Sequence, residues 1–358
     1  MQFASLDHSK ESSGGGRMPA AAPAQQPTDG PIPRPRSLTI SKKIFGLLFT
    51  LALVALFVLA IRRAPPGALE SLRHARPAPL LAGFAVFFAS HVLRGARLNR
   101  LLPEDERIAP VRAFGLSGAA HFLVQVVPFR GGDVASLGLV HRELGVSWSR
   151  SGGVFVLIKL IDTLSAVLVG LAGGAVVLLS HHVAGGPWAA GLCCVLLAAL
   201  GVLPEAGGAL LEALSARSRQ GSRLKRGLEE VGRGLAVARR DRLAYAIACL
   251  LSIGFLAAHL VGLKLTMAGL GIDVGFAALA FATLAATVAA ALVPSPAGTF
   301  GTAESGWTAA LALDGVSLGA GVVSGVAVHL LATLAAGAAA LFVLSRPALR
   351  RGRSERES

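Results

Sequence analysis

The stretch VQVVPFRGGDVASL, residues 124–137, is an apolar segment that a proline, an arginine, two glycines and an aspartate interrupt. Proline breaks a helix because it lacks an N–H and its ring clashes with the preceding turn. Glycine weakens a helix because it loses the most backbone freedom on folding. In a soluble protein this interruption would be an ordinary loop, so its meaning depends on the chain around it.

The composition indicates a membrane protein. Of the 358 residues, 53% are hydrophobic and only 15% are charged, and the mean hydropathy is +0.64. About 20 apolar residues cross the hydrocarbon core as a helix. Runs near that length lie at residues 44–61, 152–180, 187–203, 243–267, 276–293 and 316–344. A signal peptide does not explain the first run, because further runs follow it. We therefore expect an all-α polytopic membrane bundle.

Three parts of the chain are expected from composition. Residues 1–41 are rich in glycine, proline and serine and are predicted to be a disordered cytoplasmic tail. Residues 42–345 form the membrane domain, and residues 346–358 form a basic cytoplasmic tail. Within the domain, residues 209–241 place apolar side chains at helical spacing among many arginines. This segment is either a basic amphipathic helix on the cytoplasmic membrane surface or a plain linker helix.

Charge and cysteine content limit the function. The net charge of +14 would suggest nucleic acid in a soluble protein. Here the basic residues flank apolar runs, where they set topology and meet anionic lipids, so no nucleic acid partner is expected. The cysteines, residues 193, 194 and 249, form no C-x-x-C pair, and no cofactor, metal or disulfide is expected. The chain also lacks the G-x-x-x-x-G-K-[ST] motif of ATP-driven pumps.

The positive-inside rule places both termini in the cytoplasm of a protein of the cell membrane. Links 181–186 and 269–273 carry no lysine or arginine and suit the outer face. The first loop does not fit this topology, because it would lie outside although it carries four arginines, Arg62, Arg63, Arg73 and Arg76. If every apolar run crosses fully, the basic middle loop and the basic C-terminus fall on opposite sides. Two segments that enter the membrane and turn back remove this conflict, provided that protein buries them or they line a cavity.

A second interrupted segment, ALVPSPAGTFGTAESG at residues 291–306, matches the first. In the first copy Val-Pro leads through glycines to Asp133, then to GVS and to Lys159. In the second copy Val-Pro leads to Glu304, then to GVS and to His329 at similar spacing. The alternative is chance similarity between Ala/Gly/Val-rich helices. A true repeat of opposite orientation would indicate a transporter site near the bilayer midplane.

Broken helices suit an anionic ligand. The start of the second half-helix exposes N–H groups and partial positive charge, and glycines let a ligand approach the backbone. Arg130 would add a full charge and a bidentate donor. Asp133 and Glu304 either cap their half-helices or take part in substrate or proton coupling. The candidate substrate-binding residues at the breaks are Pro128, Arg130, Gly131, Gly132, Asp133, Pro294, Gly298, Gly301 and Glu304.

Ionisable residues inside spans are also candidates. Lys159 and Asp162 are three residues apart, so they share a helix face and are expected to pair. They either belong to the substrate site, with His329, or form a structural salt bridge. Lesser candidates are His121, which faces the cavity or packs, and the polar residues that end a short span, His91, Arg94 and Arg97.

These motifs together resemble a known family. RGARLNRLL, VVPFRGGDVASLGLVHRELGVS, VLIKLIDTL and LVPSPAGTFGTAESG occur in the order found in the lysylphosphatidylglycerol synthase transmembrane region, over roughly residues 44–344. That resemblance implies a flippase-like domain that moves aminoacylated phosphatidylglycerol, or other lipids and lipid-linked sugars, between leaflets. The chain departs from the family pattern where arginines are expected, at Ser136 and His329. No aminoacyl-transferase domain is expected, because little chain follows residue 344.

The leading hypothesis is therefore a flippase-like transporter that binds an anionic phospholipid or lipid-linked substrate, and not an enzyme. The alternative is a non-catalytic membrane subunit or scaffold for a separately encoded lipid-modifying enzyme, an aminoacyl-lipid synthase or a glycosyltransferase. Membrane lipids, such an enzyme and a second copy of the chain are the expected partners.

Overall fold

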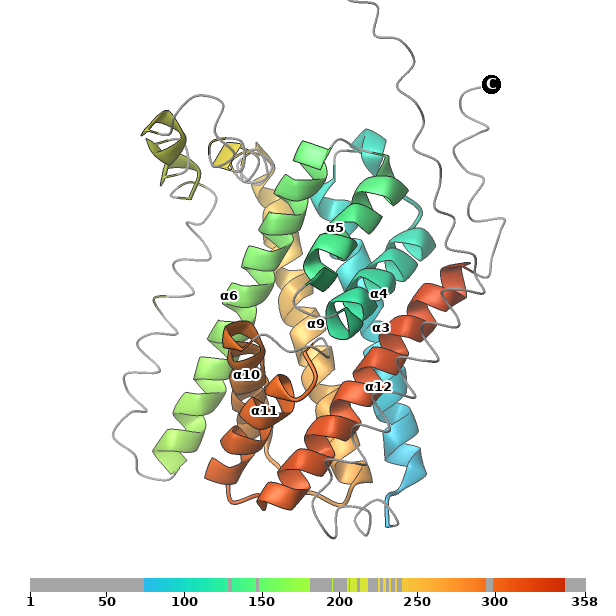
Figure 1. Cartoon of the computed structure of the whole chain (residues 1–358), viewed down its shortest axis with the longest axis vertical. Coiled ribbons are helices and arrows are strands. Elements are labelled where there is room, and N and C mark those ends of the chain that lie inside the picture. The colour runs from blue at the N-terminus through green and yellow to red at the C-terminus, as the bar shows by residue number, and fades with distance from the viewer. Residues whose placement is uncertain are drawn as a thin grey trace, which may run out of the picture. The chain divides into compact units, whose positions relative to one another are not determined.

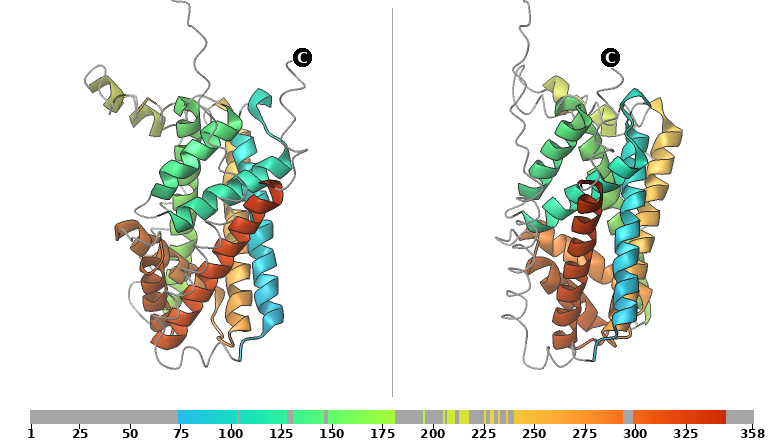
Figure 2. Two further views of the ribbon diagram at one scale, coloured as in Figure 1. Left: turned by 45° about the vertical axis from the view of Figure 1, so that its right-hand side comes forward. Right: turned by 90° about the vertical axis from the view of Figure 1, so that its right-hand side faces the viewer.

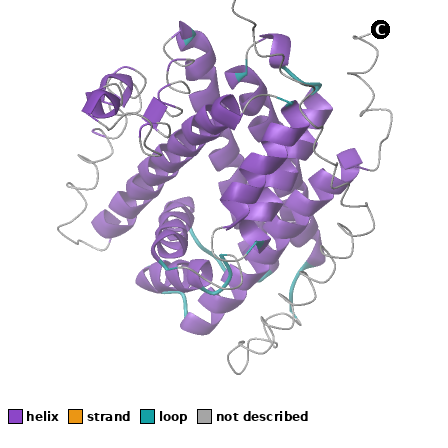
Figure 3. Ribbon diagram, turned by 45° about the horizontal axis from the view of Figure 1, so that its top comes forward, coloured by secondary structure: helices purple, strands orange, loops and turns teal. Residues whose placement is uncertain are grey.

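The computed structural model describes residues 74–102, 104–127, 131–145, 148–180, 240–293 and 299–344, with scattered residues between 195 and 236. These ranges contain helices and no strand (Figure 3). They all belong to one compact unit, residues 42–358. The predicted tails, the runs at 44–61 and 187–203 and most of segment 209–241 lie outside the described residues. An all-α helical bundle is confirmed for the described part.

Four described helices are long and apolar enough to cross a membrane. They are α3 (Pro77–Leu101), α6 (Trp148–Ser180), α9 (Arg242–Gly269) and α12 (Leu318–Leu344). The last three confirm predicted runs, and α9 begins where the Asp241 carboxylate accepts the N–H of Ala244 at 2.8 Å. The prediction of a short span before residue 102 is wrong. Helix α3 has 25 residues and is long enough to cross a membrane. Its mean hydropathy is lower than that of the other three because arginines of α3 lie inside the bundle.

The first interrupted segment forms a hairpin of α4 (Pro110–Val126) and α5 (Gly131–Leu144). Pro128, next after Val127 in the sequence, cannot continue α4. Gly132 lets the two helices pack closely, because a Cβ there would overlap the Leu123 carbonyl oxygen and the Val124 Cα. The Ser136 hydroxyl also donates to the carbonyl of Ala120 at 2.8 Å.

The second interrupted segment forms a matching hairpin of α10 (Phe276–Leu292) and α11 (Thr302–Leu313). The helices meet at Gly306, where a Cβ would lie 2.8 Å from both the Ala285 carbonyl carbon and the Ala289 Cβ. Gly301 precedes α11 with φ of 90°, a conformation that favours glycine. Both Pro/Gly breaks therefore turn the chain back instead of ending a span.

The two hairpins point in opposite directions, as an inverted repeat requires (Figures 1 and 2). Hairpin α4/α5 opens to the end of the bundle where α3 ends and α9 begins, and hairpin α10/α11 opens to the other end. At that other end the Arg76 N–H donates to the Gly269 carbonyl at 2.7 Å. Helix α4 packs on α12 and α10 packs on α6, which is the same contact after the two halves are exchanged.

Apolar packing is divided between the halves. One cluster joins α4, α5 and parts of α3, α6 and α9, and includes Leu101, Leu116, Val140, Leu157 and Ile161. The other joins α10, α11 and parts of α3, α9 and α12, and includes Phe87, Leu263, Met267, Leu279 and Leu311. Each re-entrant hairpin thus has its own buried packing, and polar side chains are left for the region between them.

Candidate functional site

A cavity of about 510 Å³ lies where the two hairpins meet. Its lining residues come from each of the eight described α-helices, and Val127 and Thr299 contribute from positions next to the two breaks. Asp162 and His329 each lie eleven residues from the start of an apolar span, at Ser151 and Leu318. At 1.5 Å per residue this is a depth of about 16 Å. Half of a hydrocarbon core of about 30 Å is close to that depth, so a bilayer centred on these spans would place the cavity near its midplane.

Two acid–base pairs line the cavity, one from each half. The Nζ of Lys159 lies 2.6 Å from Oδ1 of Asp133, and Nδ1 of His329 lies 2.5 Å from Oε1 of Glu304. These are the residues that the repeat aligns, so each half joins the acid that opens its half-helix to a base in the next span. The Asp133 and Lys159 side chains are 45% and 38% exposed, whereas those of Glu304 and His329 are 7% and 5% exposed. Only the first pair is therefore open to a ligand.

The predicted pairing of Lys159 with Asp162 is wrong. Asp162 instead receives two hydrogen bonds from the guanidinium of Arg97, of which Nη2–Oδ2 is 2.9 Å long. The same guanidinium donates to the Ser252 hydroxyl at 2.5 Å. Helical spacing places Lys159 and Asp162 on one face, but the planar fork of an arginine from α3 matches a carboxylate better than an ammonium does.

Glu304 caps α11. The Gly301 N–H donates to its Oε2 at 2.5 Å, while Oε1 faces His329. The capping alternative is confirmed for this residue, because carboxylates satisfy the free N–H groups at a helix start. A coupling role for Glu304 stays a prediction.

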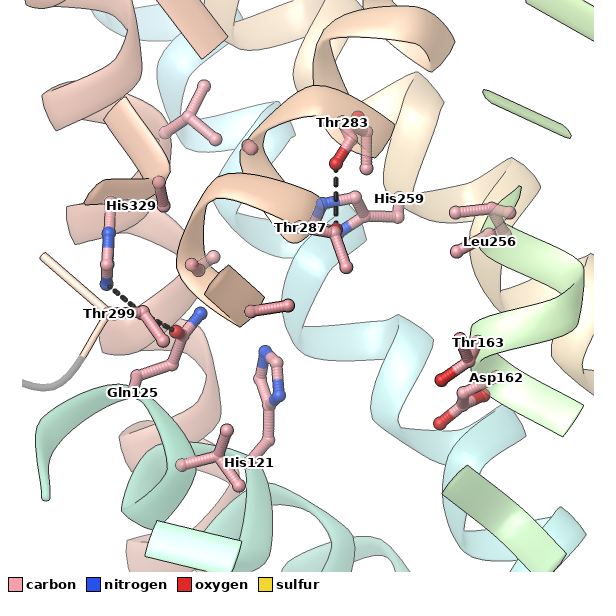
Figure 4. Close-up of a pocket in the computed structure, with 18 of the residues that line it drawn as sticks. His121, Gln125, Asp162, Thr163, Leu256, His259, Thr283, Thr287, Thr299 and His329 are labelled. Atoms are coloured by element: carbon pink, nitrogen blue, oxygen red, sulfur yellow. Dashed lines mark hydrogen bonds between the residues drawn. The ribbon is translucent and has the colours of Figure 1, made fainter. Parts of the chain in front are cut away.

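The two breaks are joined by a hydrogen bond. The Thr299 hydroxyl, just before α11, donates to Oε1 of Gln125 at the end of α4 at 2.7 Å (Figure 4). Nε2 of His329 lies 3.5 Å from the same hydroxyl. Glu304, His329, Thr299 and Gln125 thus form a polar chain that crosses from the second half to the first.

Several cavity residues were undervalued or missed in the sequence. Arg94 lies with its guanidinium carbon 4.8 Å from the centroid of the Phe255 ring and its Nη2 3.6 Å from Oδ2 of Asp162. The signal was present, because His91, Arg94 and Arg97 recur every three residues and share one face of an apolar helix. His259 gave no signal, since a single histidine in an apolar helix fits ordinary packing.

The remaining predicted site residues divide into two groups. Gly131, Gly132 and Gly301 lie at the starts of α5 and α11. Pro128, Arg130, Pro294 and Gly298 lie outside the described residues. Ser136, where the family pattern suggests an arginine, is fully buried and donates to the Ala120 carbonyl of α4.

Comparison with known proteins identifies a relationship over most of the chain. Residues 38–340 match the family model described as the lysylphosphatidylglycerol synthase TM region. The match includes both breaks, all described helices up to residue 340 and every residue of the acid–base pairs. Searches of curated proteins and of solved structures gave no match.

Proposed function

The chain belongs to the lysylphosphatidylglycerol synthase TM region family, and we propose that it moves an anionic lipid or lipid-linked precursor between the leaflets of the cell membrane. One observation carries this proposal: a cavity that contains charged side chains and is bounded by two broken hairpins of opposite orientation. Such an arrangement is typical of alternating-access transporters. The family relationship itself supports a lipid-related function in the membrane.

Each hairpin separates the cavity from one face of the membrane. If one hairpin moves away while the other stays, the cavity opens to one leaflet at a time. The Gln125–Thr299 bond joins the hairpin tips, so it has to break or shift during this exchange. An anionic headgroup entering the cavity meets Arg94 and the half-exposed pair of Lys159 and Asp133. The headgroup then competes with Asp133 for the ammonium group, while the acyl chains remain in lipid.

The proposed orientation follows from the arginines. The end of the bundle where α4 and α5 open carries many of them, at positions 100, 107, 112, 142 and 242. The opposite end carries Arg76 and Lys264 among its few described cations. By the positive-inside rule the first end is cytoplasmic. Helix α12 ends there, so the C-terminal tail is proposed to be cytoplasmic, as is the N-terminal tail.

The test is leaflet exchange in vesicles that contain the purified protein. Fluorescent phosphatidylglycerol and phosphatidylcholine with the same acyl chains are compared, and a membrane-impermeant quencher reports the outer leaflet. We expect faster exchange of phosphatidylglycerol than of phosphatidylcholine. Equal exchange of both lipids would contradict selectivity for anions. No exchange in vesicles, together with tight binding of a lipid-modifying enzyme, would support the subunit or scaffold alternative.

A further inference from the structure

We infer that Arg94 of α3, His121 of α4 and His259 of α9 form the subsite that receives the phosphate group of the ligand. The inference rests on the proposed function and names the chemical group and the residues that hold it. All three residues line the cavity, and none belongs to the repeated motifs at the breaks.

The first observation is that the described residues only partly compensate the positive charge of Arg94. Arg94 and Arg97 share one carboxylate, Asp162, and Arg97 takes both of its oxygens with hydrogen bonds. Arg94 is left 3.6 Å from Oδ2, and its Nη1 is buried with no hydrogen-bond partner among the described residues. Together the two arginines and the aspartate carry a formal charge of +1. A buried guanidinium N–H without an acceptor is unfavourable, so an oxygen ligand would stabilise it.

The guanidinium is also held in place. It lies over the face of Phe255, 4.8 Å from the ring centroid, and the attraction between a cation and an aromatic ring favours this position. Asp162 also attracts it, with 3.6 Å between Nη2 and Oδ2. The fork is therefore preorganised, which reduces the cost of binding an anion.

The second observation is a pair of imidazoles beside this guanidinium. The ring centroids of His259 and Phe255 are 5.9 Å apart, and Arg94 lies over that Phe255 ring. The ring centroids of His121 and His91 are 5.6 Å apart, and His91 precedes Arg94 by one turn on the same face of α3. Neither His121 nor His259 has a side-chain hydrogen bond to a described residue. Figure 4 shows both rings facing the same space. A neutral imidazole offers one N–H donor, so two histidines and the arginine can donate from three helices.

This set of donors fits a phosphate better than other ligands. A phosphate diester has two free, charged oxygens, and the guanidinium fork binds two oxygens at once. A cation would be repelled by the net positive charge of the arginine cluster. The nearby Thr283 and Thr287 hydroxyls already donate to carbonyls of their own helix, those of Leu279 and Thr283. The carboxylates that line the cavity already have partners. Asp162 binds Arg97, Asp133 pairs with Lys159, and Glu304 accepts the Gly301 N–H and faces His329.

The rest of the cavity wall suggests that the phosphate belongs to a lipid. The lining contains apolar side chains from α9 and α12, Leu256, Leu263, Val328 and Ala332. These side chains can contact a glycerol backbone or the first acyl carbons, whereas free phosphate would gain nothing from them. The shared chemistry is a phosphate group, and the test separates the two sources.

The test measures ligand-dependent thermal stability of the whole purified protein in detergent. The probes are dihexanoyl phosphatidylglycerol, dihexanoyl phosphatidylcholine and inorganic phosphate. We expect the first probe to raise the melting temperature in a saturable way. Arg94→Gln should weaken the apparent affinity by at least about tenfold, because a charge-assisted hydrogen bond is lost. His121→Phe and His259→Phe, which remove the N–H donor, should each weaken it by about fivefold, the value of a neutral hydrogen bond.

Two variants serve as controls. Arg94→Lys keeps the charge but loses the fork, so its affinity should be intermediate. Lys264→Gln also removes one positive charge from the bundle, but Lys264 bonds to Asp273 and the Val274 carbonyl at the end of α9, away from the cavity lining. Its affinity should equal that of wild type. If Arg94→Gln does not fold, the two histidine variants still test the subsite.

The outcomes are distinct. Binding of phosphatidylglycerol, with or without phosphatidylcholine, but not of inorganic phosphate identifies a lipid phosphate. Binding of inorganic phosphate through the same residues identifies a general phosphate site, and both results support the inference. Unchanged affinity in the Arg94 and histidine variants would overturn it. This binding assay involves no transport. A wild type that binds but does not exchange lipid would therefore contradict the proposed function and not the subsite.

Discussion

At the scale of single residues, the charges of the cavity differ in how much they depend on one partner. Arg97 is 2% exposed, and the Nη1 and Nη2 groups of its guanidinium donate to Asp162 and Ser252. Lys159 and Asp133 are far more exposed to the cavity. A buried charge that loses its partner has no water to replace it, whereas an exposed one does. The buried pair of Arg97 and Asp162 therefore stabilises the fold, and the exposed pair of Lys159 and Asp133 is available for binding.

The first prediction concerns Asp162. Asp162→Ala should destabilise the protein by about 3–5 kcal/mol, because it leaves the buried Arg97 unpaired. Lys159→Ala should cost about 1 kcal/mol or less, because the partly exposed Asp133 can be solvated. The melting temperature of each variant in detergent measures both effects. Equal losses in the two variants would show that burial does not separate these charges.

The second prediction concerns the corrected partner of Lys159. The double-mutant cycle of Lys159→Ala and Asp133→Ala should give a coupling energy of about 0.2–1 kcal/mol in stability. The matched cycle of Lys159→Ala with Asp162→Ala should give a smaller one, since Asp162 is bound by Arg97. Thermal melting of the single and double variants is the measurement. A larger coupling in the second cycle would restore the pairing that helical spacing first suggested.

Residue positions were more predictable than residue partners. The sequence repeat aligned Asp133 with Glu304 and Lys159 with His329, and the structure joins each acid to the base of its own half. The partner of Asp162 was not predictable, because Arg97 reaches it from another helix. Spacing within a helix shows which side chains share a face but not which residue approaches that face.

At the scale of elements, the re-entrant hairpins depend on close helix contact. In a membrane little hydrophobic force holds two apolar helices together, so small residues at the contact allow the packing that does. Gly132 and Gly306 provide this contact, one in each hairpin. The breaks themselves were predictable from proline and glycine in both segments. The span of α3 was not, because its arginines hid it from a hydropathy argument.

The third prediction tests these contacts. Gly132→Ala and Gly306→Ala should each destabilise the protein by about 1–3 kcal/mol, because the new methyl group meets the backbone of the facing helix. The matched control is Gly254→Ala in α9, where the Cβ would lie 3.6 Å from a Leu93 side-chain carbon, an ordinary contact. That variant should be neutral or more stable by up to about 1 kcal/mol, because alanine favours a helix. Similar melting temperatures for all three would show that hairpin packing is loose.

At the scale of the whole molecule, the inverted repeat places one cavity between two hairpins of opposite direction. Each half supplies a long helix, a re-entrant hairpin and a second long helix, in the order α3–α6 and α9–α12. The distribution of arginines and the parity of the spans predicted this arrangement from the sequence. How the halves dock was not predictable, because it depends on contacts such as α4 on α12 that join residues far apart in the chain.

The last prediction tests this arrangement by cysteine labelling from each side of the membrane. Glu104, between α3 and α4, and Asp273, between α9 and α10, suit labelling because their side chains are 87% and 99% exposed. Glu104→Cys should react with an impermeant reagent from the cytoplasmic side, and so should Arg240→Cys, two residues before α9. Asp273→Cys and Ser317→Cys should react from outside.

The physical reason lies in the hairpins. Glu104 lies at the open end of α4/α5, and Asp273 and Ser317 flank α10/α11. Two oppositely directed hairpins place these positions on opposite faces and the cavity between them. If Glu104→Cys and Asp273→Cys react from the same side, both hairpins enter from one face. The cavity would then lack a barrier toward the other leaflet, and alternating access would be ruled out.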